Sequence, residues 1–281
     1  MFEFNPEFLI RNEEIGRGLQ GVFPYRKHFL DDKWVIQVHQ VQDQNAMMRI
    51  LHGLFLNAKC EHPNIVPVAG FHLEPVQPLG WNVYTKIPRI EQTLKNMIQE
   101  YNNTGRTFYD HQVINIFHNV VWGLEHIHKK RIAHRNVSSS NIVVDKKGIA
   151  RFMDMSSAVQ TGDDEELETP KGNVGSFLSE SEYTGSKKAI SLYQEDIWGL
   201  GVVMTELCTM KVGAISATLE TFEKERVIAE TLNGISIKYG VLLANIFKSM
   251  LESNPDNRKT AKEIRENLEK YFQSELVYIE Y

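Results

Sequence analysis

The chain has 281 residues, of which 42% are hydrophobic and 24% charged, and its formal net charge is −5. A chain of this length can bury a core without disulfides or metals, and its acidic balance disfavours a general nucleic-acid binder. The cysteines Cys60 and Cys208 lie far apart, which predicts two buried free thiols in a reducing compartment. The first ten residues lack the basic start of a signal peptide, so we expect a cytoplasmic protein, with the nucleus as a second location.

The first ninety residues read as strands with one helix. Residues 34–38 form a mostly apolar, β-branched run that is typical of a buried strand. Residues 46–58 can form a helix, and residues 65–72 and 81–87 are further strand candidates. The stretch between these two candidates holds Pro75, Pro78 and Gly80, which suits a hairpin loop.

The later part of the chain changes to helical periodicity. Apolar residues recur at helical spacing within residues 94–101. A longer helix, whose expected N-cap is Asp110, has one apolar face formed by Val113, Ile116, Phe117, Val120, Leu124 and Ile127. A compact hairpin is expected over residues 142–153. The apolar stretch 197–208 is too short to span a bilayer and predicts a buried core helix. The last helix should begin near Thr260, which has capping-box spacing to Glu263.

These elements predict an α+β protein with a single two-lobed domain over residues 1–281. A small strand-rich lobe should occupy residues 1–86 and a larger, mainly helical lobe residues 90–273. Residues 86–89 would connect the lobes, and residues 274–281 would form a short tail. A cleft between two lobes is a usual place for a ligand.

A glycine motif lies near the start of the chain. Gly16, Gly18 and Gly21 match GxGxxG, a pattern that also marks dinucleotide-binding folds. A dinucleotide fold needs a helix directly after the glycines, and here the chain runs on into the strand at Trp34. Glycines between two antiparallel strands let backbone N–H groups approach phosphate oxygens. An ordinary glycine-rich hairpin is the alternative.

One segment identifies a resemblance that covers residues 9–272. Residues 133–145, AHRNVSSSNIVVD, resemble the catalytic loop HRDLxxxN of protein kinases, after a long amphipathic helix. Asp154-Met155-Ser156 follows at the spacing of the DFG motif, and residues 178–180 stand where APE is expected. Residues 195–201 resemble the family's central helix. The resemblance implies a bilobal protein-kinase-like fold with a small antiparallel β-rich lobe, and it pairs Arg258 with Glu180.

Within this resemblance, two catalytic-loop positions carry residues unsuited to phosphoryl transfer. Asn136 stands at the position of the HRD aspartate, and an amide cannot take up a proton near neutral pH. Ser138 stands where the family has a lysine that faces the transferred phosphoryl group. Its neutral hydroxyl removes positive charge from a place where negative charge must be stabilised.

The cation that normally holds the α- and β-phosphates is also missing. The strand lysine of the family corresponds to Gln37, which is neutral. Its usual glutamate partner corresponds to Gly53, or to His52 if the helix register slips by one residue. Lys33 and Lys86 are candidates for a displaced lysine.

Other family positions are retained or enlarged. Asn141 and Asp154 match the metal-binding pair, and their oxygens suit Mg²⁺, unless Asp154 only caps a turn and Asn141 only ties down the loop. Val35 and Phe23 are larger than the residues usual beside adenine, so we expect weak binding of ATP and Mg²⁺. The resemblance assigns nucleotide contacts to Gly16, Gly18, Gly21, Val35, Gln37, Thr85, Ile87 and Val143.

A group of three histidines and an acidic run could each be structural or functional. His126 and His128 diverge on a helix and His134 fits the family's core histidine, so a zinc site is not expected. The acidic run 163–168 is either a solvated loop or a built-in partner for Arg135, which in regulated kinases pairs with a phosphorylated loop.

The resemblance therefore implies a pseudokinase that acts by binding. We expect an adaptor or allosteric regulator whose partner is an active kinase, a helical-repeat scaffold or both, with no nucleic acid or membrane involved. Adaptors of the STRAD (STE20-related) type are similar in their serine-rich catalytic loop and in the aromatic-acidic end at residues 278–281. The alternative is a weakly active ATP-dependent Ser/Thr kinase. A decoy for kinase substrates is not separable from an adaptor by sequence.

Overall fold

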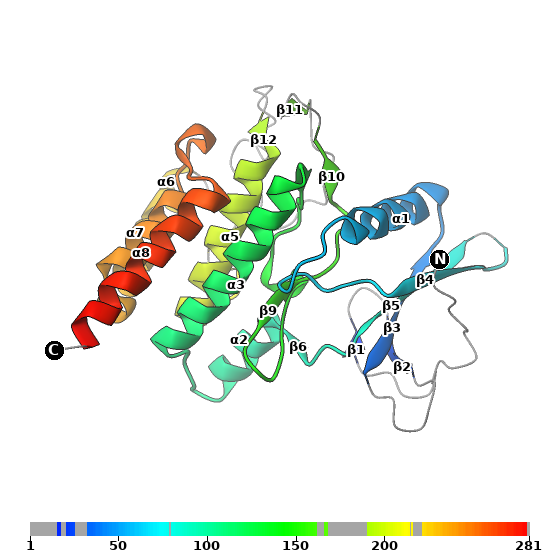
Figure 1. The fold of residues 1–281 in the computed structure, drawn as a ribbon, viewed down its shortest axis with the longest axis horizontal. Helices are drawn as coiled ribbons and strands as arrows, with labels where there is room; N and C mark the ends of the chain where they lie inside the picture. Colours follow the sequence, from blue (N-terminus) through cyan, green and yellow to red (C-terminus); the bar gives the residue numbers. More distant parts are fainter. Residues whose placement is uncertain are drawn as a thin grey trace.

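The computed structural model describes residues 16–17, 21–25, 33–78, 80–161, 166–167, 190–213, 215 and 221–279. The described chain forms a small lobe of antiparallel sheet with helix α1, and a larger lobe built mainly of helices (Figure 1). This confirms the expected bilobal α+β architecture.

The sheet of the small lobe has the strand order β1-β2-β3-β5-β4. The register sets Gln37 opposite Thr85 and His39 opposite Val83. Side chains alternate along a strand, so Gln37 and His39 share one face. The strands are β1 (Gly16–Arg17), β2 (Gly21–Tyr25), β3 (Trp34–Val41), β4 (Gly70–Pro75) and β5 (Trp81–Pro88).

Helix α1 (Gln44–Ala58) begins two residues before its predicted start. The carboxylate of Asp43 caps it by accepting a hydrogen bond from the Ala46 N–H at 2.7 Å. The strand predicted at 65–72 begins only at Gly70. The Val66 N–H donates instead to the Phe152 carbonyl at 2.8 Å, and the Val68 N–H donates to Asn57 Oδ1 at 3.2 Å. These two bonds tie the segment to the larger lobe and to α1, so the predicted strand began five residues too early, and β4 continues three residues beyond the predicted end.

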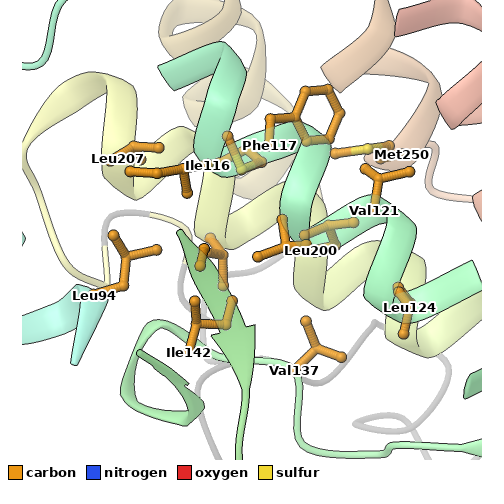
Figure 2. Packing of buried hydrophobic residues seen from close by; sticks show 14 of the residues in the cluster. Leu94, Ile116, Phe117, Val121, Leu124, Val137, Ile142, Leu200, Leu207 and Met250 are labelled. Atoms are coloured by element: carbon orange, nitrogen blue, oxygen red, sulfur yellow. The ribbon is translucent and has the colours of Figure 1, made fainter. Parts of the chain in front are cut away.

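The larger lobe packs its helices around a large hydrophobic cluster, and a smaller cluster lies between α5 and α6. Figure 2 shows Leu94, Phe117, Ile142, Leu200 and Met250 meeting in the large cluster from five different elements. The helices are α2 (Leu94–Asn103), α3 (Asp110–Lys129), α5 (Leu192–Thr209), α6 (Thr221–Tyr239), α7 (Val241–Met250) and α8 (Ala261–Ile279). The short elements are β6 (Gln92–Thr93), β7 (Ile132–Ala133), η2 (Ser139–Asn141), β8 (Ile142–Val144), β9 (Ala150–Phe152), β10 (Val159–Gln160), β11 (Glu166–Leu167), β12 (Ile190–Ser191) and η3 (Pro255–Asn257).

Three predictions about helices can be compared with these elements. Helix α5 is buried along residues 195–208, as expected of a core helix. The capping box of α8 is present, since the Thr260 N–H donates to Glu263 Oε2 at 2.8 Å. The N-cap of α3 is Tyr109 and Asp110 is its first helical residue, so that prediction was wrong by one position. Here Gln112 Oε1 accepts from the Tyr109 N–H at 3.0 Å, a capping bond that does not need Asp110.

The predictions for the cysteines and for a membrane span can also be checked. Cys60 and Cys208 are both buried and unbonded to each other. In the part of the chain that the structure describes, no helix combines the length and the apolar character needed to cross a bilayer.

Candidate functional site

One buried carboxylate of helix α5 accepts hydrogen bonds from the segment that resembles a catalytic loop. Asp196 of α5 is only 1% exposed and accepts hydrogen bonds from the backbone N–H groups of His134 at 2.8 Å and Arg135 at 2.7 Å. The His128 ring lies at 2.9 Å from the same side chain. Arg135 adopts a positive φ of 60°, a conformation that non-glycine residues hold only when their surroundings enforce it. Asp196 therefore fixes the shape of the loop independently of any chemistry at its tip.

The loop then closes on itself. The Asn141 side-chain amide donates to the Asn136 carbonyl at 3.0 Å, and the Asn141 N–H donates to the Ser138 carbonyl at 3.0 Å. Ser139 donates its hydroxyl proton to Glu206 Oε2 at 2.7 Å. Ser138 is 3% exposed, so it is both neutral and turned away from solvent. An amide at position 136 and a buried hydroxyl at 138 provide neither a general base nor a cation.

Asp154 and Asn141 lie at the same end of the β8–β9 hairpin. The Met153 N–H donates to the Asn141 carbonyl at 2.9 Å, which continues the ladder beyond the strands. Asp154 has a φ of 57°, and its Oδ1 accepts from the Ser156 N–H at 3.1 Å. Both local roles considered for these side chains, capping a turn and tying the loop, are thus present. The second Asp154 oxygen and the Asn141 amide oxygen are ligands of the kind that Mg²⁺ prefers.

Gln37 and Gly53 line a cavity that lies between β3, β5, α1 and residues 153–156. Residue 53 is buried and residue 52 is exposed, so Gly53, not His52, faces the place where the family's glutamate would lie. A Cβ added at Gly53 would lie 2.5 Å from the carbonyl oxygen of Met155. Helix α1 therefore packs directly against the backbone after Asp154 and leaves no room for a glutamate in this arrangement.

The slot expected to receive adenine is filled by its own side chains. Val35 from β3, Ile87 from β5 and Val143 from β8 form one hydrophobic cluster with exposures of 1%, 4% and 3%. These three residues come from both lobes and belong to the same buried cluster.

The glycine motif is only partly within the described chain. Strand β1 pairs antiparallel with β2, with Gly16 opposite Val22 and Arg17 opposite Gly21. The described part of the motif thus forms an antiparallel hairpin, as expected, and leads into strand β2. Gly18 lies outside the described residues.

The two candidate lysines do not line the cavity. Thr85 and Ile87 do line it, and Lys86 between them points to the other face of β5. Its ammonium group lies 4.9 Å from the centre of the Trp34 ring. Lys33 precedes β3 and its carbonyl accepts from the Arg89 N–H at 2.8 Å. Neither replaces the cation lost at Gln37.

His39 is a cavity residue that the sequence interpretation missed. Burial lowers the pKa of its imidazole, and the negative charge of Asp154 raises it by a smaller amount. The signal that could have found it is strand alternation, because His39 follows Gln37 by two positions on β3.

Two predicted pairings involve residues that are partly outside the described chain. Arg258 is engaged with Glu195 at 3.2 Å and stacks 4.8 Å from the Trp198 ring centre, whereas Glu180 lies outside the described residues. Most of the acidic run 163–168 also lies outside them, so its pairing with Arg135 stays a prediction. His126 stacks on His62 at 4.8 Å and His128 contacts Asp196, so these two rings diverge as expected.

Comparison with known proteins agrees with this geometry. The sequence matches the protein kinase domain family over residues 9–271. The serine/threonine-protein kinase Nek11 of Macaca fascicularis is 27% identical over 233 residues, which cover 82% of this chain and 34% of that protein. Nek5 of Mus musculus is 30% identical over 159 residues, covering 56% and 24%. The putative serine/threonine-protein kinase A of Trypanosoma brucei brucei is 23% identical over 217 residues, covering 74% and 47%. The chain thus spans about a third of the length of Nek11, and it belongs to the protein kinase domain family.

Proposed function

We propose that this kinase-family chain is catalytically impaired and acts by binding a protein partner, as an adaptor or allosteric regulator in intracellular signalling. The observation that carries the proposal is the pair Gln37 and Gly53 on the cavity wall, with α1 packed against Met155 where a glutamate would otherwise stand. A neutral amide beside a glycine supplies no charge for phosphates. Asn136 adds the loss of the proton acceptor.

The cluster of Val35, Ile87 and Val143 supports weak nucleotide binding, since a nucleotide must first separate packed apolar surfaces. Asn141 and Asp154 are the residues that would hold Mg²⁺ if ATP entered, and the ion would neutralise phosphate charge there.

A partner of the kinase or helical-repeat class is supported by an apolar face on the outside of α1. Met48 and Phe55 are seven residues apart, hence on one side of the helix, and are 52% and 59% exposed. Lys59 lies over the Phe55 ring at 4.4 Å. An adaptor of the STRAD type, in the cytoplasm and the nucleus, is the specific form that we propose.

The central experiment measures phosphate transfer and ATP binding on one preparation. The purified chain is incubated with labelled ATP and Mg²⁺ or Mn²⁺, alone and with a general protein substrate, beside Asp154→Ala. We expect no transfer above that variant and little change in melting temperature at millimolar ATP. A ligand at 100 times its Kd would add about 2.7 kcal/mol of stability. Transfer that disappears in Asp154→Ala would refute the proposal.

The partner is tested separately. Candidate kinases of the same cellular source are assayed for activity with and without the purified chain, and with Phe55→Glu. We expect one kinase whose activity changes with the wild-type chain and not with the variant. An unchanged effect of Phe55→Glu would exclude the α1 face as the contact.

The second candidate is a weakly active Ser/Thr kinase. It is favoured by the retained Asn141 and Asp154 pair, placed at one end of the hairpin, and by relatives that are named serine/threonine-protein kinases. Effects of residues that act as a unit are not additive, so several losses need not multiply to zero. The transfer assay with Asp154→Ala distinguishes the two candidates.

A further inference from the structure

Exposed apolar side chains gather where helix α6 turns into α7, on the side of the larger lobe that faces away from the small lobe (Figure 1). Ile237, Val241 and Leu242 are 80%, 60% and 51% exposed. Only Gly240 separates the two helices, so these three residues lie close together. A contiguous group of large apolar side chains on a surface is typical of a contact site.

Tyr109 extends this group from the start of helix α3. Its side chain is 69% exposed. The carbonyl of the preceding residue, Phe108, accepts a hydrogen bond from the Tyr239 hydroxyl at 3.1 Å. This buried bond ties the end of α6 to the start of α3, so Tyr109 lies beside the end of α6. We call the four residues Tyr109, Ile237, Val241 and Leu242 the corner patch.

The corner patch is flanked by one charge of each sign. Lys238 is exposed, and its ammonium group lies 4.7 Å from the centre of the Tyr239 ring. Asp110 is also exposed and directly follows Tyr109. Burial raises the pKa of the Cys208 thiol beneath them, while the charge of Lys238 lowers it and that of Asp110 raises it. Both charges therefore lie near the same buried point, the cation on α6 and the anion on α3.

These two charges indicate which kind of surface fits the patch. In a two-fold symmetric dimer, each contact between two residues occurs twice, once in each direction. An apolar centre with a cation from one helix and an anion from another can therefore be complementary to itself. A strongly acidic or strongly basic partner would instead meet a like charge. Charge complementarity thus favours a second copy of this chain as the occupant.

From this geometry we propose that the corner patch binds a second copy of the chain, in a two-fold symmetric contact that sets Lys238 of one copy against Asp110 of the other. Four side chains make a small interface, below about 1,200 Å², so we expect a transient dimer with a Kd in the micromolar range. The inference goes beyond the proposed adaptor role, because it requires no other protein and leaves the outer face of α1 accessible.

Self-association is measured by sedimentation of the full chain at concentrations from about 1 µM to about 500 µM. We expect a monomer–dimer equilibrium that shifts with concentration. Val241→Glu puts a charge into the apolar centre of both copies and should raise the Kd of the dimer at least about thirtyfold. Phe222→Glu is the matched control, since Phe222 is 81% exposed at the opposite end of α6 and its replacement should leave the Kd unchanged.

Two charge reversals test the pairing itself. Lys238→Asp sets two anions against each other in both halves of the symmetric contact, and Asp110→Lys sets two cations against each other. Each variant alone should dimerise at least about tenfold more weakly than wild type. In an equal mixture both pairs again have opposite signs, so the heterodimer should form with about the wild-type Kd. A fluorescent label on one variant distinguishes the heterodimer.

Three outcomes would overturn the proposal. They are a wild-type chain that stays monomeric over the whole concentration range, a dimer that persists in Val241→Glu, and a mixture that associates no better than the separate variants. Circular dichroism of each variant confirms folding, and Lys238→Asp alone carries the charge test if Asp110→Lys is unfolded. Neither nucleotide nor another protein is present, so failure of this proposal leaves the adaptor role intact.

Discussion

The two sides of the interlobe region differ in how much of the kinase arrangement they keep. Below the catalytic-type loop, Asp196 accepts two backbone hydrogen bonds, and Arg258 is fully buried beside Glu195. Above it, Gln37 and Gly53 on the cavity wall carry no charge, and Val35 packs in one cluster with Ile87 and Val143. The two sides therefore differ in charge: a buried carboxylate supports the loop, and uncharged residues stand at positions 37 and 53.

This difference separates what folding needs from what phosphoryl transfer needs. A buried carboxylate that satisfies backbone N–H groups stabilises the domain whether or not a reaction follows. A lysine–glutamate pair over the phosphates contributes only when a nucleotide is bound. Retention of the first, with uncharged residues at positions 37 and 53, agrees with the binding role proposed above.

Asp196→Ala should give the largest loss of stability. It leaves the His134 and Arg135 N–H groups and the His128 ring without their acceptor in the core. We expect a cost of about 3–5 kcal/mol, by analogy with breaking a buried ion pair, measured by urea unfolding. The control is Glu91→Ala, which removes an exposed pair with Lys146 and should cost no more than about 1 kcal/mol. Equal effects would break the comparison.

Gly53→Ala should give the next largest effect and probes the upper side. The new methyl group would lie 2.5 Å from the Met155 carbonyl oxygen, so α1 must shift. We expect a loss of about 1–3 kcal/mol, as for other overpacked cores. Gly234→Ala, in helix α6 with no atom within 4 Å, should instead stabilise the chain by roughly 0.5–1 kcal/mol. If both variants were stabilised, the close packing at Gly53 would be disproved.

These sites also show how far sequence reasoning reaches. The two lobes, the antiparallel glycine hairpin and helix α5 follow from local periodicity and motif order, and the structure contains them. The start of β4 at Gly70 could not be predicted from the sequence, because the backbone N–H groups of Val66 and Val68 donate to residues distant in sequence.

The site divides in the same way. The sequence interpretation placed Gln37 in the cavity wall but missed His39, which lies two positions further along β3. No local sequence pattern shows that Gly53 packs against the Met155 backbone. Contacts between the lobes depend on the position of helix α1 relative to the larger lobe. That placement is decided by packing of the whole domain, which a single sequence does not display.

Val35→Ala should sharpen the comparison by opening the adenine slot. Removing two methyl groups from the cluster with Ile87 and Val143 should cost about 1–3 kcal/mol. The same variant should show a larger rise of melting temperature with ATP than the wild type. Val202→Ala, in the separate cluster of α5, is equally buried and should lose stability without any gain in the ATP response. An identical rise of melting temperature with ATP in both variants would mean that the volume of Val35 does not limit nucleotide binding.

The smallest expected effect concerns Glu206, which links α5 to the loop through Ser139 and also accepts from the Gly213 N–H at 2.7 Å. Burial raises the pKa of its carboxyl above the usual 4.5, and those two hydrogen bonds oppose the rise only in part. The folded chain therefore holds a proton that the unfolded chain has released, and its stability falls as pH rises through the folded pKa. The contribution is fully present below about pH 4.5.

The amide in Glu206→Gln has no proton to lose, so the stability of this variant relative to wild type should increase as pH rises above 4.5 and level off once the pH exceeds the raised pKa of Glu206 in the folded chain. The difference between the two unfolding profiles is the quantity to measure, because burial lowers the pKa of His134 and gives both proteins an additional loss of stability in acid. That histidine contributes equally to both profiles and cancels in the difference. A difference that does not change with pH would mean that Glu206 ionises in the folded protein as it does in the unfolded one. Burial of this carboxyl beside Ser139 would then not destabilise its charged form.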